Sequence, residues 1–215
     1  MSNEKIYNLA GEIFDIAKEN NCTIWLDHGT LLGIVRDGDI LPWDKDFDIS
    51  VFEEEFDGLK QYLFEKLHSR QDLTFKISNR FVKIIQKNSQ VKIDISKYRC
   101  VDGMFQKTII DQHNWKIFRK TRGSINYLIS MLNPIQNKII YLLRSLLFRL
   151  GDLFGKRCVS EVPQKYFSAF EEIELKGGVF IIPVNATEYL AHWYGDDWLV
   201  PNRNWSISKN DRSLI

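Results

Sequence analysis

Three aspartates at alternate positions, Asp44, Asp46 and Asp48, are the residues of this chain whose spacing is best suited to chemistry. Phe47 and Ile49 are apolar, so the pattern predicts a strand that buries one face and presents carboxylates on the other. Carboxylates two positions apart on a strand lie about 6.5 Å apart, which lets their oxygens converge on shared cations. The pattern therefore indicates a site for a divalent metal ion.

The charge around these acids supports the same interpretation. Residues 37–57 include nine acids and one base. Like charges at close range disfavour joint ionisation, so crowding raises carboxylate pKa values unless a cation supplies charge. A hard ion with oxygen ligands, Mg²⁺ or Mn²⁺, fits best. The alternative is a solvated acidic loop, and the acids within 53–57 are typical of the first turn of a helix.

A glycine-threonine pair precedes the acids. Gly29 and Thr30 lie where a predicted strand over 22–26 meets a predicted short helix over 31–35. Backbone amides and a hydroxyl at such a junction can face a phosphate. Arg36, near the end of this helix, is a candidate to pair with a phosphate oxygen or to clamp a neighbouring aspartate.

Two further side chains near the acids have open roles. Trp43 is a candidate to stack on a base or to cover a cationic head group by a cation–π contact, although a core tryptophan beside Pro42 is the commoner case. Asp44 is a candidate substrate-binding residue. His28 is more typical of a structural hydrogen-bonding residue than of a base.

A later acid, Asp94, stands between Ile93 and Ile95 in a predicted strand. An acid flanked in this way points away from the buried side, or toward a partner that stabilises it there. The pair Asp46 and Asp48 offers such a partner through a shared cation. We expect all three carboxylates to lie in one cleft beside the glycine-threonine pair.

The elements that must position these residues mix helices and strands, which predicts an α/β (α+β) fold. Helices are expected over 3–20, 56–67 and 186–193, and three short segments rich in branched residues, 73–77, 81–86 and 91–96, predict an antiparallel meander. An aromatic and polar cluster over 194–205 is a candidate pocket rim, or ordinary packing under a loop.

The whole chain has 215 residues and 44% hydrophobic residues, enough for one domain with an appended segment. Three cysteines without zinc or redox spacing, and an amphipathic rather than signal-like start, favour a cytoplasmic location. Residues 116–165 include ten bases and two acids. An acidic centre with a basic outer region suits a phosphorylated or membrane-associated substrate better than nucleic acid.

Within that basic region, 125–154 is apolar but interrupted by polar and charged residues, so no run is long enough to span a bilayer. It is either an amphipathic helix at the inner face of a membrane or a hairpin packed on its own domain or a partner. We therefore divide the chain into a catalytic core over 1–115, a basic apolar helical insertion over 116–165, and a C-terminal part over 166–215 that packs back on the core.

These motifs together resemble the LicD family of phosphotransferases, which is related to fukutin and lies in the nucleotidyltransferase-fold superfamily. The resemblance rests on Leu26-Asp-x-Gly-Thr-Leu-Leu-Gly-x-x-Arg36, Pro42-Trp-Asp-x-Asp-x-Asp48, Asp94, and Glu188-Tyr-Leu followed by Tyr194-Gly-Asp-Asp-Trp and Pro201. It implies a mixed, twisted sheet flanked by helices. Two departures are Lys45, where relatives often have aspartate, and the stretch 119–157, which matches nothing in the family pattern.

The resemblance implies metal-dependent transfer of a phosphorylated alcohol, such as phosphocholine, from a cytidine-diphosphate (CDP) donor to a hydroxyl of a cell-surface glycan or lipid-linked sugar. Asp46, Asp48 and Asp94 would be catalytic and hold the metal, while Gly29, Thr30, Arg36, Trp43 and Asp44 would bind substrate. A nucleotide-sugar glycosyltransferase with an Asp-x-Asp site is the second reading. An inactive scaffold that docks on a membrane is the third.

Overall fold

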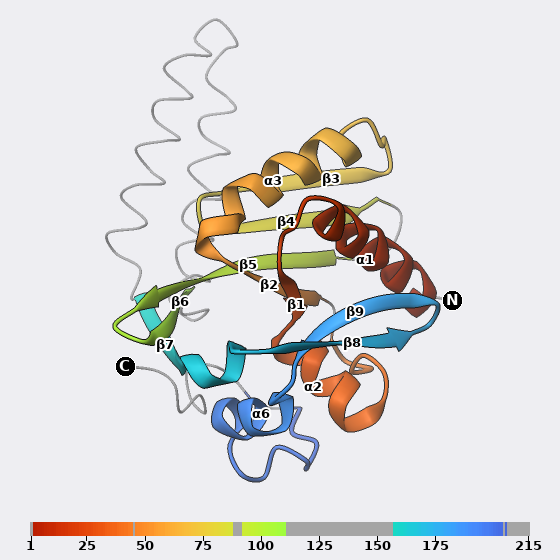
Figure 1. Ribbon diagram of the computed structural model, residues 1–215. Helices are drawn as coiled ribbons and strands as arrows, with labels where there is room; N and C mark the ends of the chain where they lie inside the picture. The colour runs from red at the N-terminus through yellow and green to blue at the C-terminus, as the bar shows by residue number, and fades with distance from the viewer. Residues whose placement is uncertain (1, 45, 88–91, 111–156, 204, 206–215) are drawn as a thin grey trace, which may run out of the picture.

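The computed structural model describes residues 2–44, 46–87, 92–110, 157–203 and 205 (Figure 1). The basic segment 125–154 and Lys45 lie outside these residues, so the expected membrane or hairpin role of the segment stays a prediction. No helix among the residues described is both long enough and apolar enough to cross a bilayer.

A seven-stranded mixed sheet forms the centre of the molecule, with β1, β2, β5, β4 and β3 side by side in that order and β6 and β7 continuing from β5. Only β2 and β5 pair in parallel among the described strands of this sheet; the other pairs are antiparallel. The strands are β1 (Ile24–Leu26), β2 (Phe47–Phe52), β3 (Leu73–Ile77), β4 (Phe81–Gln86), β5 (Lys92–Val101), β6 (Met104–Ile110) and β7 (Arg157–Pro163). The predicted meander, β3 to β5, is confirmed.

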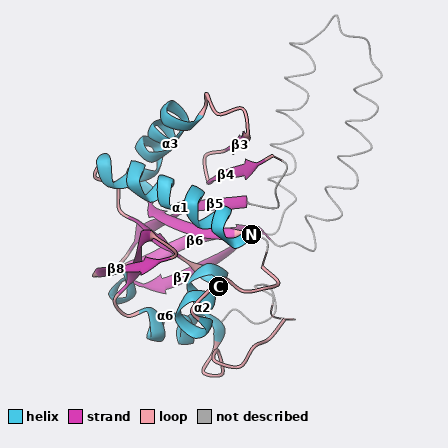
Figure 2. Ribbon diagram, turned by 90° about the vertical axis from the view of Figure 1, so that its right-hand side faces the viewer, coloured by secondary structure: helices cyan, strands magenta, loops and turns pink. Residues whose placement is uncertain are grey.

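Two helices, α1 (Ser2–Glu19) and α3 (Glu53–Leu67), cover one face of this sheet (Figures 1 and 2). The odd-numbered residues of β2 and β5 face these helices, and Ile49, Ile93 and Ile95 are fully buried. The even-numbered residues point to the other face, because side chains alternate along a strand. The mixed sheet with flanking helices confirms the predicted fold class and leaves the aspartates on the face opposite α1 and α3.

The helix α2 (His28–Asp37) begins at the end of β1 and packs against β2. The Asp27 side chain accepts a hydrogen bond from the His28 backbone N–H and caps the helix. Gly38 ends it with a left-handed backbone, φ 75°. The helix therefore begins earlier than the predicted 31–35, and Gly29 and Thr30 lie in its first turn.

The C-terminal elements pack on the N-terminal ones. β9 lies against β1 and α1, and α6 lies against α2. The elements are η2 (Gln164–Phe167), β8 (Phe170–Leu175), β9 (Gly178–Pro183) and α6 (Ala186–Tyr194). Residues 157–163, which the sequence interpretation placed in the helical insertion, instead form β7 and pair with β6. Ser160 and Val162, which lie on the same face of β7, are fully buried there.

Candidate active site

Asp48 and Asp94 lie side by side on the polar face of the sheet. They are register partners on the parallel strands β2 and β5. Lys83 of β4 is the register partner of Asp94 on its other side, and its Nζ lies 2.7 Å from Asp94 Oδ2. Asp48, Asp94 and Lys83 therefore lie side by side across three adjacent strands.

The carboxyl groups of Asp48 and Asp94 are harder to ionise than ordinary aspartates. Burial, followed by the negative charges of Asp44, Asp94 and Asp27, raises the pKa of Asp48 well above its ordinary value, although Lys107 acts in the opposite direction. Burial also raises the pKa of Asp94, with a smaller contribution from Asp46 and against the effect of Lys83. The predicted effect of crowding on pKa is confirmed for these two acids.

Asp46 lies just before β2, at the edge of this row. Its Oδ1 is 3.6 Å from Lys92 Nζ. Oδ1 of Asp46 and Oδ1 of Asp94 are both buried and accept no hydrogen bond from any described residue. Carboxylate oxygens in this state suit a hard divalent ion, which binds oxygen ligands. The residues thus fit a metal in chemistry, although no three described acids, histidines or cysteines are spaced to hold one as they stand.

Gly29 lets α2 approach the acids. A Cβ at this position would overlap Asp44 Oδ2 and would lie 3.7 Å from Asp48 Oδ2. The first turn of α2 and the two carboxylates thus meet at a point where a Cβ would force the Asp44 carboxylate to move. The close approach of backbone and acids is the geometry expected from the glycine-threonine pair.

Thr30 has a different contact from the one expected. Its side chain is 1% exposed, and its hydroxyl oxygen accepts a hydrogen bond of 2.8 Å from the Asp48 backbone N–H. The Asp27 backbone N–H also donates to the Asp48 carbonyl, at 3.1 Å. Thr30 therefore joins α2 to β2 and positions Asp48, and its hydroxyl is engaged within the protein.

The contact of Thr30 gives a stability prediction. Thr30→Val keeps the shape but leaves the Asp48 N–H without its partner in the interior, which costs about 1–3 kcal/mol of unfolding free energy. Urea denaturation measures this loss. Thr30→Ser keeps the hydroxyl and is the control; if both variants lost the same stability, the hydroxyl would have no such role.

A cavity of about 270 Å³ opens beside Gly29, Asp44 and Asp48 and extends to α6 and the loop that follows α6. We call it the aromatic cavity. Its lining is aromatic and charged: His28, Gly29, Leu32, Arg36, Leu41, Trp43, Asp44, Asp48, Trp193, Tyr194, Asp197, Trp198, Val200, Asn202, Arg203 and Trp205. The pocket-rim interpretation of 194–205 is thereby confirmed. Among the expected substrate-binding residues, all but Thr30 line this cavity.

Arg36 and Trp43 occupy the outer wall of the cavity. Arg36 donates two hydrogen bonds of 2.8 Å to Asp37 and one of 3.4 Å to the Trp198 carbonyl. The Arg203 guanidinium stacks over the Trp43 ring at 4.9 Å. Arg36 therefore clamps a neighbouring aspartate, Asp37, and it also lines the cavity.

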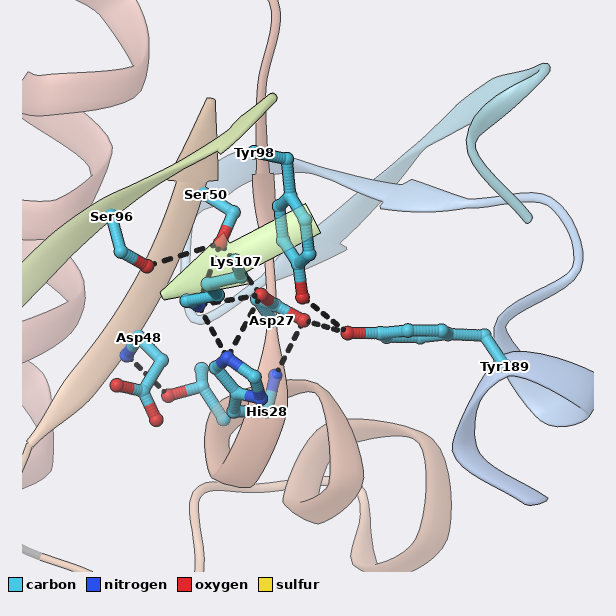
Figure 3. A network of polar contacts seen from close by, with 9 residues as sticks. Asp27, His28, Asp48, Ser50, Ser96, Tyr98, Lys107 and Tyr189 are labelled. Carbon is cyan, nitrogen blue, oxygen red and sulfur yellow. Dashed lines mark hydrogen bonds and ion pairs between the residues drawn. The ribbon is translucent and has the colours of Figure 1, made fainter. Parts of the chain in front are cut away.

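Behind the acids lies a buried polar network that the sequence interpretation missed (Figure 3). Its centre is Asp27, which is fully buried. Ser50 Oγ donates to Asp27 at 2.6 Å, Tyr189 of α6 donates at 2.5 Å, and Lys107 of β6 donates at 3.2 Å. Lys107 also donates to His28 Nε2 and stacks over the Tyr98 ring at 5.0 Å.

The charges within this network follow from its contacts. Burial alone would raise the pKa of Asp27, but His28, Lys107 and the hydrogen bonds from Ser50 and Tyr189 outweigh burial and hold it far below its ordinary value. Burial lowers the pKa of His28 to about 3, against the pull of Asp27 and with the help of Lys107. Asp27 is therefore ionised and His28 neutral at pH 7, which agrees with a structural role for His28.

The sequence held one weak signal for this network. Asp27 stands within the Leu26-Asp-x-Gly-Thr motif, next to residues already assigned a role. Lys107 stands in Phe105-Gln-Lys-Thr108, a segment without any recognisable pattern. Only the fold brings Lys107 to Asp27, 80 residues away.

The raised pKa values predict a pH dependence. The folded protein binds more protons at Asp48 and Asp94 than the unfolded chain does, whose aspartates have a pKa of about 3.9. Without metal, their contribution to stability is fully present below about pH 4 and is lost as the pH rises through the folded-state pKa values. We expect the melting temperature in a chelator to fall between about pH 5 and 7 more steeply for the wild type than for Asp48→Asn.

The comparison between variants isolates Asp48, because other groups contribute equally to both curves. Added Mg²⁺ should flatten the wild-type curve and leave Asp48→Asn unchanged, since the ion offsets the charge that burial penalises. Parallel wild-type and variant curves in the chelator would contradict the assigned shift.

A mixed sheet, a glycine in the first turn of α2 and two neighbouring aspartates on one face are the features expected from the resemblance to nucleotidyltransferases. Residues 21–124 match the family model LicD/FKTN/FKRP, nucleotidyltransferase domain. This range includes Gly29, Thr30 and the three acids, so the family resemblance expected from the motifs is confirmed over this part of the chain.

Individual relatives match over shorter stretches. An uncharacterized protein of Rickettsia prowazekii (strain Madrid E) is 39% identical over 64 residues, 29% of this chain and 24% of that protein. Ribitol 5-phosphate transferase FKRP of Homo sapiens is 46% identical over 37 residues, 17% of this chain and 8% of FKRP. The matches thus cover a quarter or less of the length of each of these relatives.

Among solved structures, the lincosamide antibiotic adenylyltransferase LnuA, bound to lincomycin, is similar at 13% identity. The match covers 84% of this chain and 82% of LnuA, with a TM-score of 0.42.

Proposed function

We propose that this protein is a metal-dependent transferase that moves a phosphorylated alcohol from a CDP-activated donor to a hydroxyl of a cell-surface glycan or lipid-linked sugar. The observation that carries the proposal is the pairing of Asp48, which lines the aromatic cavity, with Asp94 on the neighbouring strand, both with raised pKa values. The match of residues 21–124 to the LicD/FKTN/FKRP family model supports the class of reaction.

Asp46, Asp48 and Asp94 would hold Mg²⁺ or Mn²⁺. The bound ion would supply positive charge for the phosphoryl oxygens and the leaving phosphate. The Oδ1 atoms of Asp46 and Asp94, which accept no hydrogen bond from a described residue, support this assignment. Asp46 would exchange its distant contact with Lys92 for the ion.

The donor would lie in the aromatic cavity. Trp43 and Trp198 offer flat faces for a base or a cationic head group. The backbone at Gly29 and the Arg36 and Arg203 guanidinium groups would face the phosphates. The position of the cavity beside Asp48 would bring the scissile phosphate to the acids.

Asp94 would accept the proton of the attacking hydroxyl. A carboxyl group whose pKa lies above its ordinary value is a better base than a normal aspartate. Lys83, which donates to Asp94 Oδ2, would fix the orientation of the carboxyl group.

A screen of CDP-alcohols with Mg²⁺ or Mn²⁺ tests the proposal, with acceptor-dependent release of cytidine monophosphate (CMP) as the readout. CDP-choline, CDP-glycerol and CDP-ribitol should be compared, because no described side chain separates these alcohols. Release of nucleotide from a sugar nucleotide, and from no CDP-alcohol, would instead indicate a nucleotide-sugar glycosyltransferase. No release from any donor, with full metal binding, would favour the scaffold.

A further inference from the structure

The row of register partners that contains Asp48 and Asp94 continues across β4 and β3. Lys83 of β4 is the register partner of Asp94, and Lys76 of β3 is the register partner of Lys83. Side chains at directly opposed positions share one face of a sheet, so two acids and then two bases lie in one line across four strands. The acids thus have a basic surface beside them, on the strands farthest from β1.

The two lysines are not neutralised equally. Lys83 Nζ lies 2.7 Å from Asp94 Oδ2, and an ammonium group has two further N–H donors beyond that contact. Lys76 is exposed, and it forms no ion pair with any acid that the structure describes. Like charges at opposed positions of a sheet repel each other, and a bound anion would offset this repulsion. This part of the sheet therefore favours an anionic group between Lys76 and Lys83.

An aromatic side chain lies on the same face, beside the lysines. Phe81 stands two residues before Lys83 on β4, so both side chains point to one face, and Phe81 is 37% exposed. Its register partner, Ser96, lies two residues after Asp94 on β5. The apolar face of a sugar ring packs well on an exposed aromatic ring. A basic pair and an aromatic platform are thus neighbours, next to the acid that would take the proton of the acceptor.

We call Lys76, Phe81 and Lys83 the β3–β4 surface. Figure 1 shows β4 and β3 at the end of the sheet away from α2 and α6, and the strand order β2, β5, β4, β3 puts the two acids between α2 and this surface. Asp48 lines the aromatic cavity, whereas the three residues of the surface do not. Neighbouring strands are about 4.8 Å apart, so Lys76 lies about 10 Å from Asp94, a distance that a sugar with an anionic substituent spans.

We propose that the β3–β4 surface binds the acceptor as an anionic sugar, with the ring on Phe81 and the negative group between Lys76 and Lys83. The inference rests on the proposed function, in which the donor fills the aromatic cavity. The attacking and leaving oxygens of a phosphoryl transfer lie roughly in line on opposite sides of phosphorus. A donor beside Asp48 and an acceptor beside Asp94 meet this requirement, because they approach the acids from opposite sides.

Titration of the isotope-labelled full-length chain, followed by NMR of its backbone amides, tests the inference. Glucose 1-phosphate and glucuronate are the probes for a phosphate and for a carboxylate, and glucose is the uncharged control. At least one anionic probe should bind at least about threefold more tightly than glucose, as expected for contacts between exposed charges, and should shift the amides of β3 and β4. The anionic probe that binds more tightly identifies the negative group of the acceptor.

Two variants then locate the probe. Lys76→Glu replaces attraction by repulsion and should weaken the anionic probe by at least about threefold, with little change for glucose. Phe81→Ala should weaken all three sugars, because it removes the platform for the ring. Lys66→Glu and Phe64→Ala change exposed residues of α3, on the other side of the sheet, and are the matched controls. Melting curves show that each variant folds.

A second ligand separates the two sites. CMP should shift the amides of α2 and α6, which line the aromatic cavity, and should not displace the anionic probe. Four results would overturn the inference: anionic probes that bind no better than glucose, shifts confined to the aromatic cavity, either surface variant binding the probe as the wild type does, or displacement of the probe by CMP.

Failure of the proposed function would look different. A chain that binds the anionic probe on the β3–β4 surface, but does not bind CMP or release it from any donor, would overturn the proposed function. The two failures are therefore distinguishable.

Discussion

Asp48→Asn should lower the rate of transfer by at least about 100-fold, since even residues that only support a metal ligand are typically worth about 10–100-fold. The substitution removes a charged oxygen ligand and keeps the size of the side chain. Acceptor-dependent CMP release with Mg²⁺ in excess is the measurement.

The same substitution should leave the metal-free protein as stable as the wild type or more stable. Burial and the charges of Asp44, Asp94 and Asp27 already disfavour the ionised form of Asp48, so a neutral amide relieves repulsion. A loss of activity together with unchanged or raised stability distinguishes a catalytic defect from misfolding. Asp94→Asn should behave similarly, although it also leaves Lys83 without its partner.

Asp57→Asn is a suitable control. Asp57 is an exposed acid of α3, and its carboxylate pairs with Lys60. It belongs to the acid-rich range 37–57 but does not line the aromatic cavity. Asp48→Asn with wild-type turnover would remove these acids from the candidate active site. Equal losses in Asp48→Asn and Asp57→Asn would point to overall charge instead.

The local part of the site was predictable because it is encoded by short spacings. Alternation around Asp46 and Asp48 fixes which side of β2 they face. The flanking isoleucines do the same for Asp94, and register between two parallel strands then brings the acids together. A pattern of period two thus predicts which face of the sheet each side chain occupies, and this prediction was correct for Asp48 and Asp94.

What the sequence could not predict depends on contacts between distant segments. Thr30 was expected to face a phosphate because helix starts often bind anions, but Asp27 caps the helix earlier and turns the hydroxyl toward β2. Strands β6 and β8 were not assigned, since their segments mix charged and apolar residues. Lys107, on β6, was missed with them.

Lys107→Met should lower the unfolding free energy by about 3–5 kcal/mol, the usual cost of removing one partner of a buried ion pair. Asp27 is fully buried and keeps its charge largely because His28 and Lys107 are close. Methionine preserves most of the side-chain volume, so the loss is electrostatic and not a cavity effect. Urea denaturation at neutral pH is the measurement.

The double variant Asp27→Asn with Lys107→Met separates this explanation from simple loss of packing. Removing both charges together should recover most of the stability, because the penalty comes from the charge left unpaired. Lys76→Met, on an exposed part of β3, should have little effect. A double variant as unstable as Lys107→Met alone would show that the ion pair is not the source of the loss.

Lys107 also connects stability to the chemistry of the acids. It is the positive charge that opposes the rise in the pKa of Asp48, so its removal should make Asp48 harder to ionise and weaken divalent metal binding at pH 7. The metal affinity of Lys107→Met should then recover as the pH is raised, because the carboxylate ionises at higher pH. Metal binding that is unchanged from wild type at every pH would confine Lys107 to a structural role.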